Sequence, residues 1–436
     1  MSYYSDYIIE TFKSVYKIDP DINLNYGNSD SKISIQNKAF DYFNSEFINP
    51  PDIIWKEWFG TEIPFLFDND NTLPIISYSE NSVVINYDII GSAFFFLGNW
   101  QELESTKRDS MGRYPFKESL QSQYNFAHLP VVNYYFDILK TVIEHVEGVT
   151  IERKLWKKSS FAVSVSHDID KINSGWIEGS ANSLKKGRIV KALKGVLLKV
   201  FKKDPWNNLN EILELENQLQ VNSTFFFLTK KGNGNADYQF DEVSLYFKNI
   251  RDHNSEVALH ASLNSYKDPE ILEKEAGYFD KKTKGLRFHF LKYDPVLYSE
   301  VLDQTSLEYD SSSGFAEHIG FRNGYCFPFR PFNHTLKQAS NFISIPLVIM
   351  DATLRSKNYM DLQLNSLHQI SKITNEVENF GGLLTILWHN NYFSDFKFKG
   401  WSEFFINIIN DLKSRGASFH TCEQICNIYK GNSGKI

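Results

Sequence analysis

The chain is poor in cysteine, and its few cysteines are badly placed for cross-linking or metal binding. Only Cys326, Cys422 and Cys426 occur among 436 residues. An odd count does not form a disulfide framework, and no other Cys or His pair lies close to Cys422 and Cys426, which argues against a zinc cluster. We therefore expect a reducing compartment and predict a cytoplasmic protein.

The chain also lacks the patterns of export, membrane insertion and nucleic-acid binding. Its first ten residues are polar, aromatic and acidic, without the basic start and apolar core of a secretory signal. No apolar run reaches the length of about 18 residues that a transmembrane helix needs. The net charge of −7 argues against general nucleic-acid binding.

Length and pattern indicate two domains. In the first part, short strand-like pieces such as 82–87 alternate with Asn/Asp-rich turns and with helical segments at 89–96 and 131–146. We predict a smaller α+β domain over residues 1–155. The second domain is predicted to span residues 156–436.

From residue 161 onward, strand patterns alternate with helix patterns. The expected strands are 161–166, 223–228, 256–263, 285–291, 307–310, 342–350, 383–389 and 417–420. The expected helices between them include 242–251, 269–280, 295–302, 361–379 and 402–414. This alternation predicts an α/β fold with a parallel sheet, and seven or eight such units close most naturally into a (β/α) barrel.

The segment His167-Asp168-Ile169-Asp170 is the most informative part of the sequence. It follows an apolar, β-branched run that is typical of a buried strand. Carboxylates and an imidazole at the mouth of such a strand are costly to desolvate unless they bind something. Because side chains alternate along a strand, Asp168 and Asp170 are expected to point to the same side. One of them could then hold a metal while the other acts as a base.

Polar residues also end other predicted strands. His260 lies late in the third strand, Arg287 and His289 belong to the fourth, and Trp388 and His389 end the seventh. The carboxyl ends of barrel strands form one face, where active sites assemble. We therefore expect these residues to form one site.

Part of this set has the chemistry of metal ligands. Asp170 and His260 are of the kind that binds zinc, and also manganese, cobalt or iron. Asn264 lies four residues after His260, so a helical turn or a curling loop could bring both to one ion. His167 and His289 are the other candidates for a third ligand. We expect a divalent metal, with zinc as the first candidate.

The remaining polar groups suit metal-assisted hydrolysis of an amide or ester. A bound metal lowers the pKa of its water and polarises an acyl oxygen. Asp168 is placed to take the proton from that water, and Arg287 could hold Asp168 ionised and oriented. His389, arriving from the opposite side of the barrel mouth, could protonate the leaving group.

Five segments carry a resemblance to a known family. They are Ser166–Asp170, Ser223–Phe227, Leu259–Ser262, Gly285–Phe290 and Leu387–Asn390. In these segments the second domain resembles the polysaccharide deacetylases, metal-dependent carbohydrate esterases with a distorted (β/α) barrel. The resemblance implies that Asp168 is the base and that Asp170 and His260 ligate the metal. It also implies that Arg287 orients the base and that His389 is the acid.

The resemblance covers roughly residues 155–430 and implies a barrel of about seven strands. Residues 1–150 resemble a domain of unassigned function that precedes deacetylase-like domains in some bacterial proteins. The family usually has a His where this chain has Asn264, and prolines where it has Phe288 and His289. Two alternatives follow: an active hydrolase, or a non-catalytic carbohydrate-binding or scaffold protein with a decayed site.

Three charged segments allow both a functional and a structural interpretation. Residues 184–203 combine eight Lys and Arg residues with apolar residues at helical spacing. This amphipathic helix could make a peripheral membrane contact or dock a lipid-linked or nucleotide-linked sugar, or it could be the first barrel helix with a solvated lysine face. Arg322, in a glycine-bounded loop, could clamp a substrate carboxylate or phosphate or belong to a structural turn. The charged loop at 102–114 could touch a ligand or be a solvated turn.

Taken together, the sequence predicts a cytoplasmic, metal-dependent hydrolase that removes an acyl group from a sugar, as an N- or O-deacetylase. Arg322, Trp388 and His289 are expected to contact the acylated sugar or glycan. The resemblance places such an activity in bacterial surface-polysaccharide biosynthesis. No nucleic acid and no transmembrane segment are expected.

Overall fold

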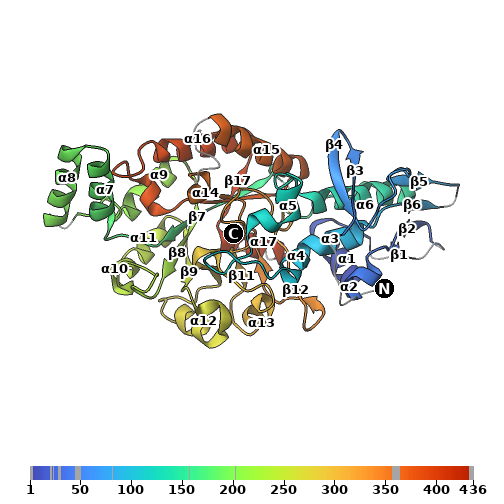
Figure 1. Ribbon diagram of the computed structural model, residues 1–436, viewed down its shortest axis with the longest axis horizontal. Coiled ribbons are helices and arrows are strands. Elements are labelled where there is room, and N and C mark those ends of the chain that lie inside the picture. The colour runs from blue at the N-terminus through green and yellow to red at the C-terminus, as the bar shows by residue number, and fades with distance from the viewer. Residues whose placement is uncertain are drawn as a thin grey trace.

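The computed structural model describes residues 3–19, 22, 24–27, 31–44, 51–80, 82–156, 158–201, 203–355 and 364–431. Two parts follow one another along the chain, and their elements lie at opposite ends of the long axis in Figure 1. The first is a mixed α+β part and the second is an α/β part built around one large sheet. The α/β fold and the smaller α+β part before it are both confirmed. The boundary near residue 155 stays a prediction.

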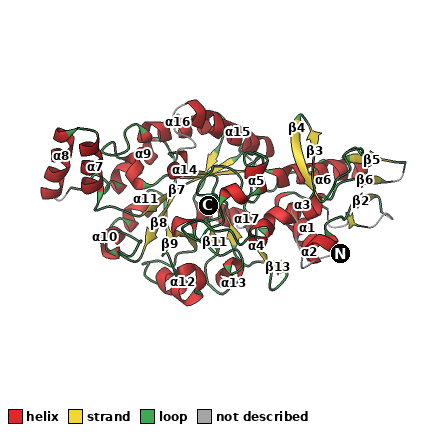
Figure 2. Cartoon of the chain, in the orientation of Figure 1, coloured by secondary structure: helices red, strands yellow, loops and turns green. Residues whose placement is uncertain are grey.

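A parallel sheet forms the centre of the second part, and helices surround it in Figure 2. Its strands run in the order β14-β11-β10-β9-β8-β7-β16-β15, and β17 also pairs with β7. Their bounds are β7 Ala162–Ile169, β8 Ser223–Leu228, β9 Glu256–Ala261, β10 Gly285–Phe288, β11 Tyr309–Asp310, β14 Ile343–Ser344, β15 Ile349–Met350, β16 Leu383–Leu387 and β17 Ser418–Phe419. No pairing joins β14 to β15 among the described residues, so the barrel is distorted and stays open there.

Strand β8, near the centre of this sheet, is buried on both faces. In β8, Ser-Thr-Phe-Phe-Phe-Leu is buried at every position. In an open barrel, helices cover the outer face of such a strand and side chains of other strands fill the inner face, so neither face meets water and a continuous apolar run is favoured. This is why the sequence pattern located β8 at its observed bounds.

The expected single strand at 342–350 is wrong, because the chain forms two strands there. Ile343–Ser344 and Ile349–Met350 lie at opposite edges of the sheet. Pro346 lies between them, and a proline has no N–H to donate to a strand ladder. The chain therefore crosses from one edge of the open barrel to the other at this point.

Helices of the second part lie between the strands in the expected alternation. Their bounds are α7 Gly175–Lys185, α8 Ile189–Val200, α9 Leu209–Gln218, α10 Phe240–Ser244, α11 Phe247–Asp252, α12 Pro269–Ala276, α13 Tyr298–Asp303, α14 Asp351–Leu354, α15 Leu364–Phe380, α16 Trp401–Ser414 and α17 Cys422–Tyr429. The helix expected at 361–379 corresponds to α15, and the expected residues 361–363 lie outside the described residues. The helix expected over 184–203 is instead a hairpin, because Gly187 adopts a left-handed φ of 68° and ends α7.

The first part packs helices against small sheets. The helices are α1 Tyr3–Val15, α2 Phe40–Asn44, α3 Ile89–Leu97, α4 Trp100–Glu104, α5 Leu120–Gln123 and α6 Val131–Glu147. One sheet has the order β1-β2-β6-β5, with bounds Asn25–Tyr26, Ile33–Ile35, Val83–Ile85 and Ile76–Tyr78. Two antiparallel pairs are β3 Ile53–Trp58 with β4 Thr61–Leu66, and β12 Phe332–Asn333 with β13 Gln338–Ala339, which belong to the first and second part respectively.

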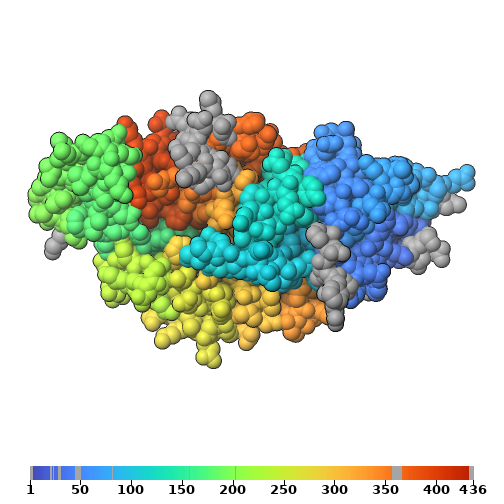
Figure 3. All heavy atoms as spheres, viewed as in Figure 1, coloured from blue at the N-terminus to red at the C-terminus, as the bar shows by residue number. Residues whose placement is uncertain are grey.

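The two parts share one hydrophobic core. A single cluster of buried side chains runs from α1 and α6 into β7 and β16. The segment that follows α4 lies across the second part, where it appears in cyan in Figure 3. There the Arg113 guanidinium donates a hydrogen bond to the Phe290 carbonyl at 2.9 Å. The first part therefore reaches the rim of the barrel.

None of the described helices has both the length and the apolar character that crossing a membrane requires.

Candidate active site

Strand β7 brings both aspartates to the carboxyl end of the sheet on one side. Asp168 is buried, and its carboxylate accepts a hydrogen bond from Arg287 at 2.8 Å. Asp170, two residues on, faces His260 at 3.3 Å and His289 at 3.5 Å. The shared orientation expected for these two aspartates is what a strand imposes.

His167 lies on the other side of β7. One of its ring nitrogens lies 2.6 Å from the Trp388 carbonyl, and the other lies 2.8 Å from Glu216 Oε1. Both nitrogens are therefore engaged inside the core. His167, a candidate third metal ligand on sequence grounds, is a structural residue.

Arg287 holds Asp168 from a fixed position. Its Nε donates to the Ser311 carbonyl, a second nitrogen donates to Ser311 Oγ, and the guanidinium covers the Phe226 ring. Burial acts to raise the pKa of Asp168, but the charges of Arg287 and His260 outweigh it and keep that pKa below its usual value. Asp168 is therefore an oriented, ionised carboxylate.

Three ligand atoms converge beside it, from Asp170, His260 and His289. All lie within 4.8 Å of one another. His260 Nδ1 lies 2.8 Å from the Arg287 carbonyl, and His289 Nε2 lies 2.9 Å from the Gly234 carbonyl. Each of these nitrogens carries the proton that it donates to the carbonyl. In the neutral rings, His260 Nε2 and His289 Nδ1 are therefore lone pairs that face each other at 3.0 Å.

This arrangement fits a metal ion better than it fits a proton. Asp170 Oδ1 is buried and makes no hydrogen bond to any described residue. Burial raises the pKa of Asp170 less than His289 and His260 lower it, so the group is ionised. A proton on His260 Nε2 could be donated to only one neighbouring acceptor. A cation between Asp170, His260 and His289 would contact all three ligand atoms. One carboxylate and two imidazoles are also a ligand set of catalytic zinc sites, which keep an open position for water.

The structure does not bring Asn264 to this cluster. Strand β9 stays extended through Ala261, so the four-residue spacing from His260 is not a helical one. Asn264 is exposed at the start of the short helix Ser265–Lys267. His289, from the strand next to β9, takes the third position instead.

His389 faces the cluster from the other side. It follows β16, and its Nε2 lies 3.9 Å from Asp170 Oδ2. Its Nδ1 is 2.8 Å from Asp351 Oδ1, and its backbone N–H donates to Asp351 Oδ2. Burial lowers the pKa of His389, but Asp351 and the site carboxylates raise it to about 10. His389 therefore carries a proton that points toward the cluster.

Asp351 was missed by the sequence analysis. It is fully buried and begins α14 directly after β15. The signal was present, because an acidic residue at the end of a strand is the same pattern that drew attention to Asp168 and Asp170. Asp351 follows the end of a strand at Met350 whether 342–350 is one strand or two.

A cavity of about 710 Å³ opens over the cluster. Its wall includes Asp168, Asp170, His260, His289 and His389. The remaining wall contains basic and aromatic side chains, namely Arg113, Lys171, Phe290, Arg355, Tyr392, Lys397 and Phe398. The charged loop of the first part therefore contributes to the cavity through Arg113, and contact of this loop with a ligand stays a prediction.

Trp388 and Arg322, both expected at the substrate, lie elsewhere. Trp388 is fully buried among Trp401 and Phe405 and does not line the cavity. Arg322 is also buried and makes a bidentate ion pair with Glu102 of the first part, with both contacts at 2.7 Å. The guanidinium does clamp a carboxylate, as its chemistry suggested, but the carboxylate belongs to the chain itself.

Comparison with known proteins adds a match for the first part. Residues 4–147 match a family model described as "Family of unknown function (DUF7033)". This agrees with the expectation of an N-terminal domain of unassigned function. No curated protein matches the chain.

The solved structures similar to this chain include an allantoinase and two deacetylases. Puue allantoinase has 11% identity and a TM-score of 0.40, over 64% of this chain and 94% of that one. The peptidoglycan deacetylase PdaC from Bacillus subtilis has 13% identity and a TM-score of 0.30, over 63% and 94%. The chitin deacetylase from the fungal pathogen Colletotrichum lindemuthianum has 13% identity and a TM-score of 0.29, over 61% and 87%. Likeness at this level assigns neither a substrate nor an activity.

Proposed function

We propose that the chain is a metal-dependent hydrolase that removes an acyl group from a sugar. The observation that carries the proposal is the convergence of Asp170 Oδ1, His260 Nε2 and His289 Nδ1, with Asp170 Oδ1 buried and unpartnered among the described residues. A buried polar atom without a partner is costly, and a cation at this point removes the cost for all three atoms. Zinc is the expected metal.

The side chains around this point divide the work of hydrolysis. A divalent cation held there would lower the pKa of a nearby water and polarise an acyl oxygen. Asp168 accepts the proton of the attacking water, because its carboxylate is ionised and lies 3.6 Å from His260 Nε2, at the edge of the cluster. Arg287 keeps one carboxylate oxygen engaged at 2.8 Å, so the other oxygen faces the cavity.

His389 supplies the acid. Its protonated ring approaches the cluster from the side opposite to Arg287, and Asp351 fixes which nitrogen points inward. Donation of the Nε2 proton to the leaving nitrogen or oxygen completes the cleavage. Asp351 acts through His389 and does not face the cavity.

The form of the cavity supports a sugar as the substrate. At about 710 Å³ it lies within the size range of small-molecule sites. Phe290 lies in its wall and is 41% exposed, whereas Tyr392 and Phe398 are buried there and stack on each other at 4.1 Å. Aromatic faces beside polar groups suit the apolar and hydroxylated sides of a sugar ring. An acylated glycan of bacterial surface-polysaccharide biosynthesis, handled in the cytoplasm, is the substrate class that follows from the resemblance.

Metal analysis of the purified protein tests this proposal. We expect stoichiometric zinc or a similar divalent metal, which Asp170→Ala removes and Asp168→Asn retains. Acetate release from N-acetylglucosamine oligomers should be lost in both variants. A wild-type protein that stays metal-free after incubation with zinc contradicts the proposal.

The alternative is a non-catalytic carbohydrate-binding or scaffold protein. The exposed position of Asn264 favours it, because the residue at the place of the family's second histidine does not reach the cluster. In such a protein a proton on His260 would fill the gap, since the pKa of His260 is raised by Asp168 and Asp170 in spite of burial. Sugar binding without metal uptake would support this alternative.

A further inference from the structure

The hairpin of α7 and α8 projects from the second part at the end of the molecule farthest from the N-terminal helices in Figure 1. Its outer helix exposes an unusual number of large apolar side chains. They are Ile189, Val190, Leu193, Val196, Leu197, Val200 and Phe201, each at least 48% exposed. On an ideal helix of about 100° per residue these positions form one arc of about 140°. An apolar arc of this width normally faces a core.

Small residues, not large ones, pack α8 onto α7. Ala192 and Gly195 are the only buried residues among those described in α8. A side-chain Cβ at Gly195 would lie 2.1 Å from Ser180 Oγ, and Ser180 Oγ also donates to the Ala192 carbonyl at 3.0 Å. The helix is therefore fixed in an orientation that turns its apolar arc to the outside.

The same segment carries a strong positive charge. Residues 184–203 contain eight Lys and Arg residues and no acidic residue, in a chain whose net charge is −7. Lys185, Lys186, Lys194 and Lys199 are all exposed, and at about 100° per residue Lys194 directly adjoins the apolar arc. The hairpin thus combines apolar and cationic groups on one exposed surface.

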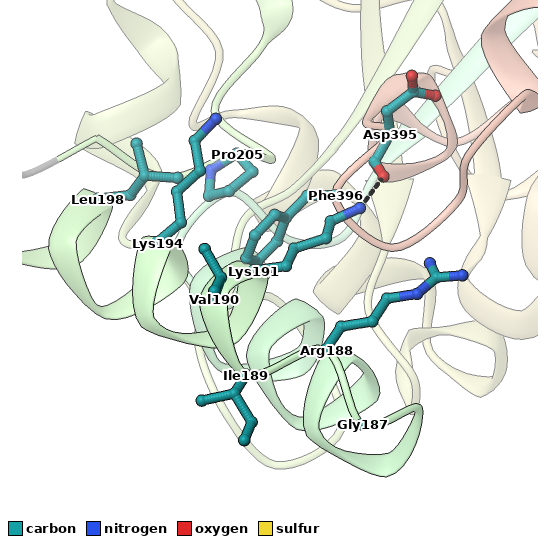
Figure 4. Close-up of a pocket in the computed structure, with 10 residues that line it drawn as sticks. All are labelled: Gly187, Arg188, Ile189, Val190, Lys191, Lys194, Leu198, Pro205, Asp395 and Phe396. Carbon is teal, nitrogen blue, oxygen red and sulfur yellow. Dashed lines mark hydrogen bonds between the residues drawn. The ribbon is translucent and has the colours of Figure 1, made fainter.

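An open groove of about 860 Å³ is lined by α8 and by the loop at Asp395 and Phe396, whose ring lies against Gly195 of α8. Figure 4 shows Lys191 reaching across it to the Asp395 carbonyl at 2.9 Å, while Ile189 points away from that loop. On the other side of the hairpin base, Glu178 of α7 pairs with Lys171 and Lys397, which line the catalytic cavity. The hairpin is therefore fastened to the rim of the site.

We propose that the α7–α8 hairpin docks the protein on the surface of an anionic lipid bilayer. A helix that lies in the bilayer interface buries an apolar face among the acyl chains and places flanking lysines at anionic headgroups. A second copy of this chain is a poor occupant, because two such surfaces would bring like positive charges against each other. Docking through this surface does not depend on the hydrolytic activity.

Vesicle flotation with matched variants tests the proposal. We expect the wild-type chain to bind vesicles of phosphatidylcholine with phosphatidylglycerol. Its binding to vesicles of phosphatidylcholine alone should be at least about tenfold weaker. Leu193→Ser with Leu197→Ser should lower binding at least about tenfold. The control is Leu245→Ser with Leu336→Ser, which replaces two similarly exposed leucines outside the hairpin and should bind like the wild type.

A second pair of variants tests the charge. Lys185→Gln with Lys186→Gln should weaken binding to the anionic vesicles, whereas Lys281→Gln with Lys282→Gln, another exposed lysine pair, should not. High salt should weaken binding of the wild type in the same way. Unchanged thermal melting of all four variants shows that the fold is kept.

The proposal is overturned if the wild type does not bind the anionic vesicles or if the hairpin and control variants bind equally. It is also overturned if the chain is a dimer that only the hairpin leucine variant dissociates, since the apolar arc would then be covered by a second copy.

Discussion

The two ends of the barrel contain the same kinds of polar residue in opposite states. At the amino ends of the strands, Glu256 accepts hydrogen bonds from the Tyr309 hydroxyl, Thr224 Oγ1 and the Glu423 backbone N–H. At the carboxyl ends, Asp170 Oδ1 is buried without a hydrogen-bond partner in the described part of the chain. Both carboxylates are held by the same sheet, but within the described residues only Asp170 has an oxygen that is still free to accept a hydrogen bond or bind a cation.

The histidines differ in the same way in their hydrogen bonding, although all three lie near the carboxyl ends of their strands. His167 has a partner for each ring nitrogen, a carbonyl on one side and Glu216 on the other. His260 and His289 each use one nitrogen on a carbonyl, and their second nitrogens face each other. Burial alone therefore does not separate site from scaffold here. The unused lone pair does, because a structural residue in a core is expected to be satisfied.

The largest expected effect is at the carboxyl end. Asp168→Asn keeps the shape and the contact with Arg287 but cannot take a proton, so kcat should fall by about 10²–10⁴. Metal content and melting temperature should stay close to those of the wild type. Steady-state kinetics with metal analysis of the same sample measures both. Full activity of this variant would show that another group is the base.

At the scaffold side the same type of change should affect stability instead. His167→Leu leaves buried Glu216 without its ring partner and should lower the free energy of unfolding by about 3–5 kcal/mol. Metal uptake should persist in the folded protein. Urea denaturation measures the free energy of unfolding. The matched variant His260→Leu should lose the metal and should change the free energy of unfolding less than His167→Leu does. Equal effects of the two variants on metal binding would break the comparison.

Glu256 gives a pH-dependent test. Burial raises its pKa to about 7 in spite of its hydrogen bonds. A carboxyl with a raised pKa in the folded state stabilises the fold below its ordinary pKa, and this contribution is lost as pH rises through about 7. Glu256→Gln should therefore match the wild type near pH 4.5 and become more stable than it above pH 7, by up to about 3 kcal/mol. Urea melts at several pH values give the difference, and a constant difference across pH would contradict the expected titration.

The smallest effect is expected at Asn264. Because its side chain is exposed and away from the cluster, Asn264→Ala should leave metal content unchanged and alter kcat by less than about twofold. His289→Ala is the matched change at the third ligand position and should lower the bound metal below stoichiometry. Loss of metal in Asn264→Ala would instead support the ligand set Asp170, His260 and Asn264 that was predicted from the sequence.

The parts of the site that could be predicted from the sequence are those set by strand alternation. The placement of Asp168 and Asp170 on one side, and of His260 and Arg287 on neighbouring strands, follows from parallel strands whose carboxyl ends meet at one edge. The third ligand was harder to place, because the choice between Asn264 and His289 depends on where β9 stops being extended. No local pattern in the sequence states this.

The placement of Arg322 and of Arg113 has a common cause, which is packing between distant segments. Arg322 lies in a glycine-bounded loop that looks exposed in the sequence, yet it meets Glu102 from a region 220 residues away. The break between β14 and β15 was signalled by Pro346, but the apolar run around it outweighed that signal. Arg113 reached the cavity only because the first part folds across the barrel.

The central claim is that Asp170, His260 and His289 hold one metal ion. An anomalous difference map from crystals grown with zinc, recorded on both sides of the zinc absorption edge, tests it directly. We predict a single strong peak between the three ligand atoms, next to Asp168 and out of reach of Asn264. The absence of a peak there in zinc-soaked crystals, or a peak bound by other side chains, would contradict the account.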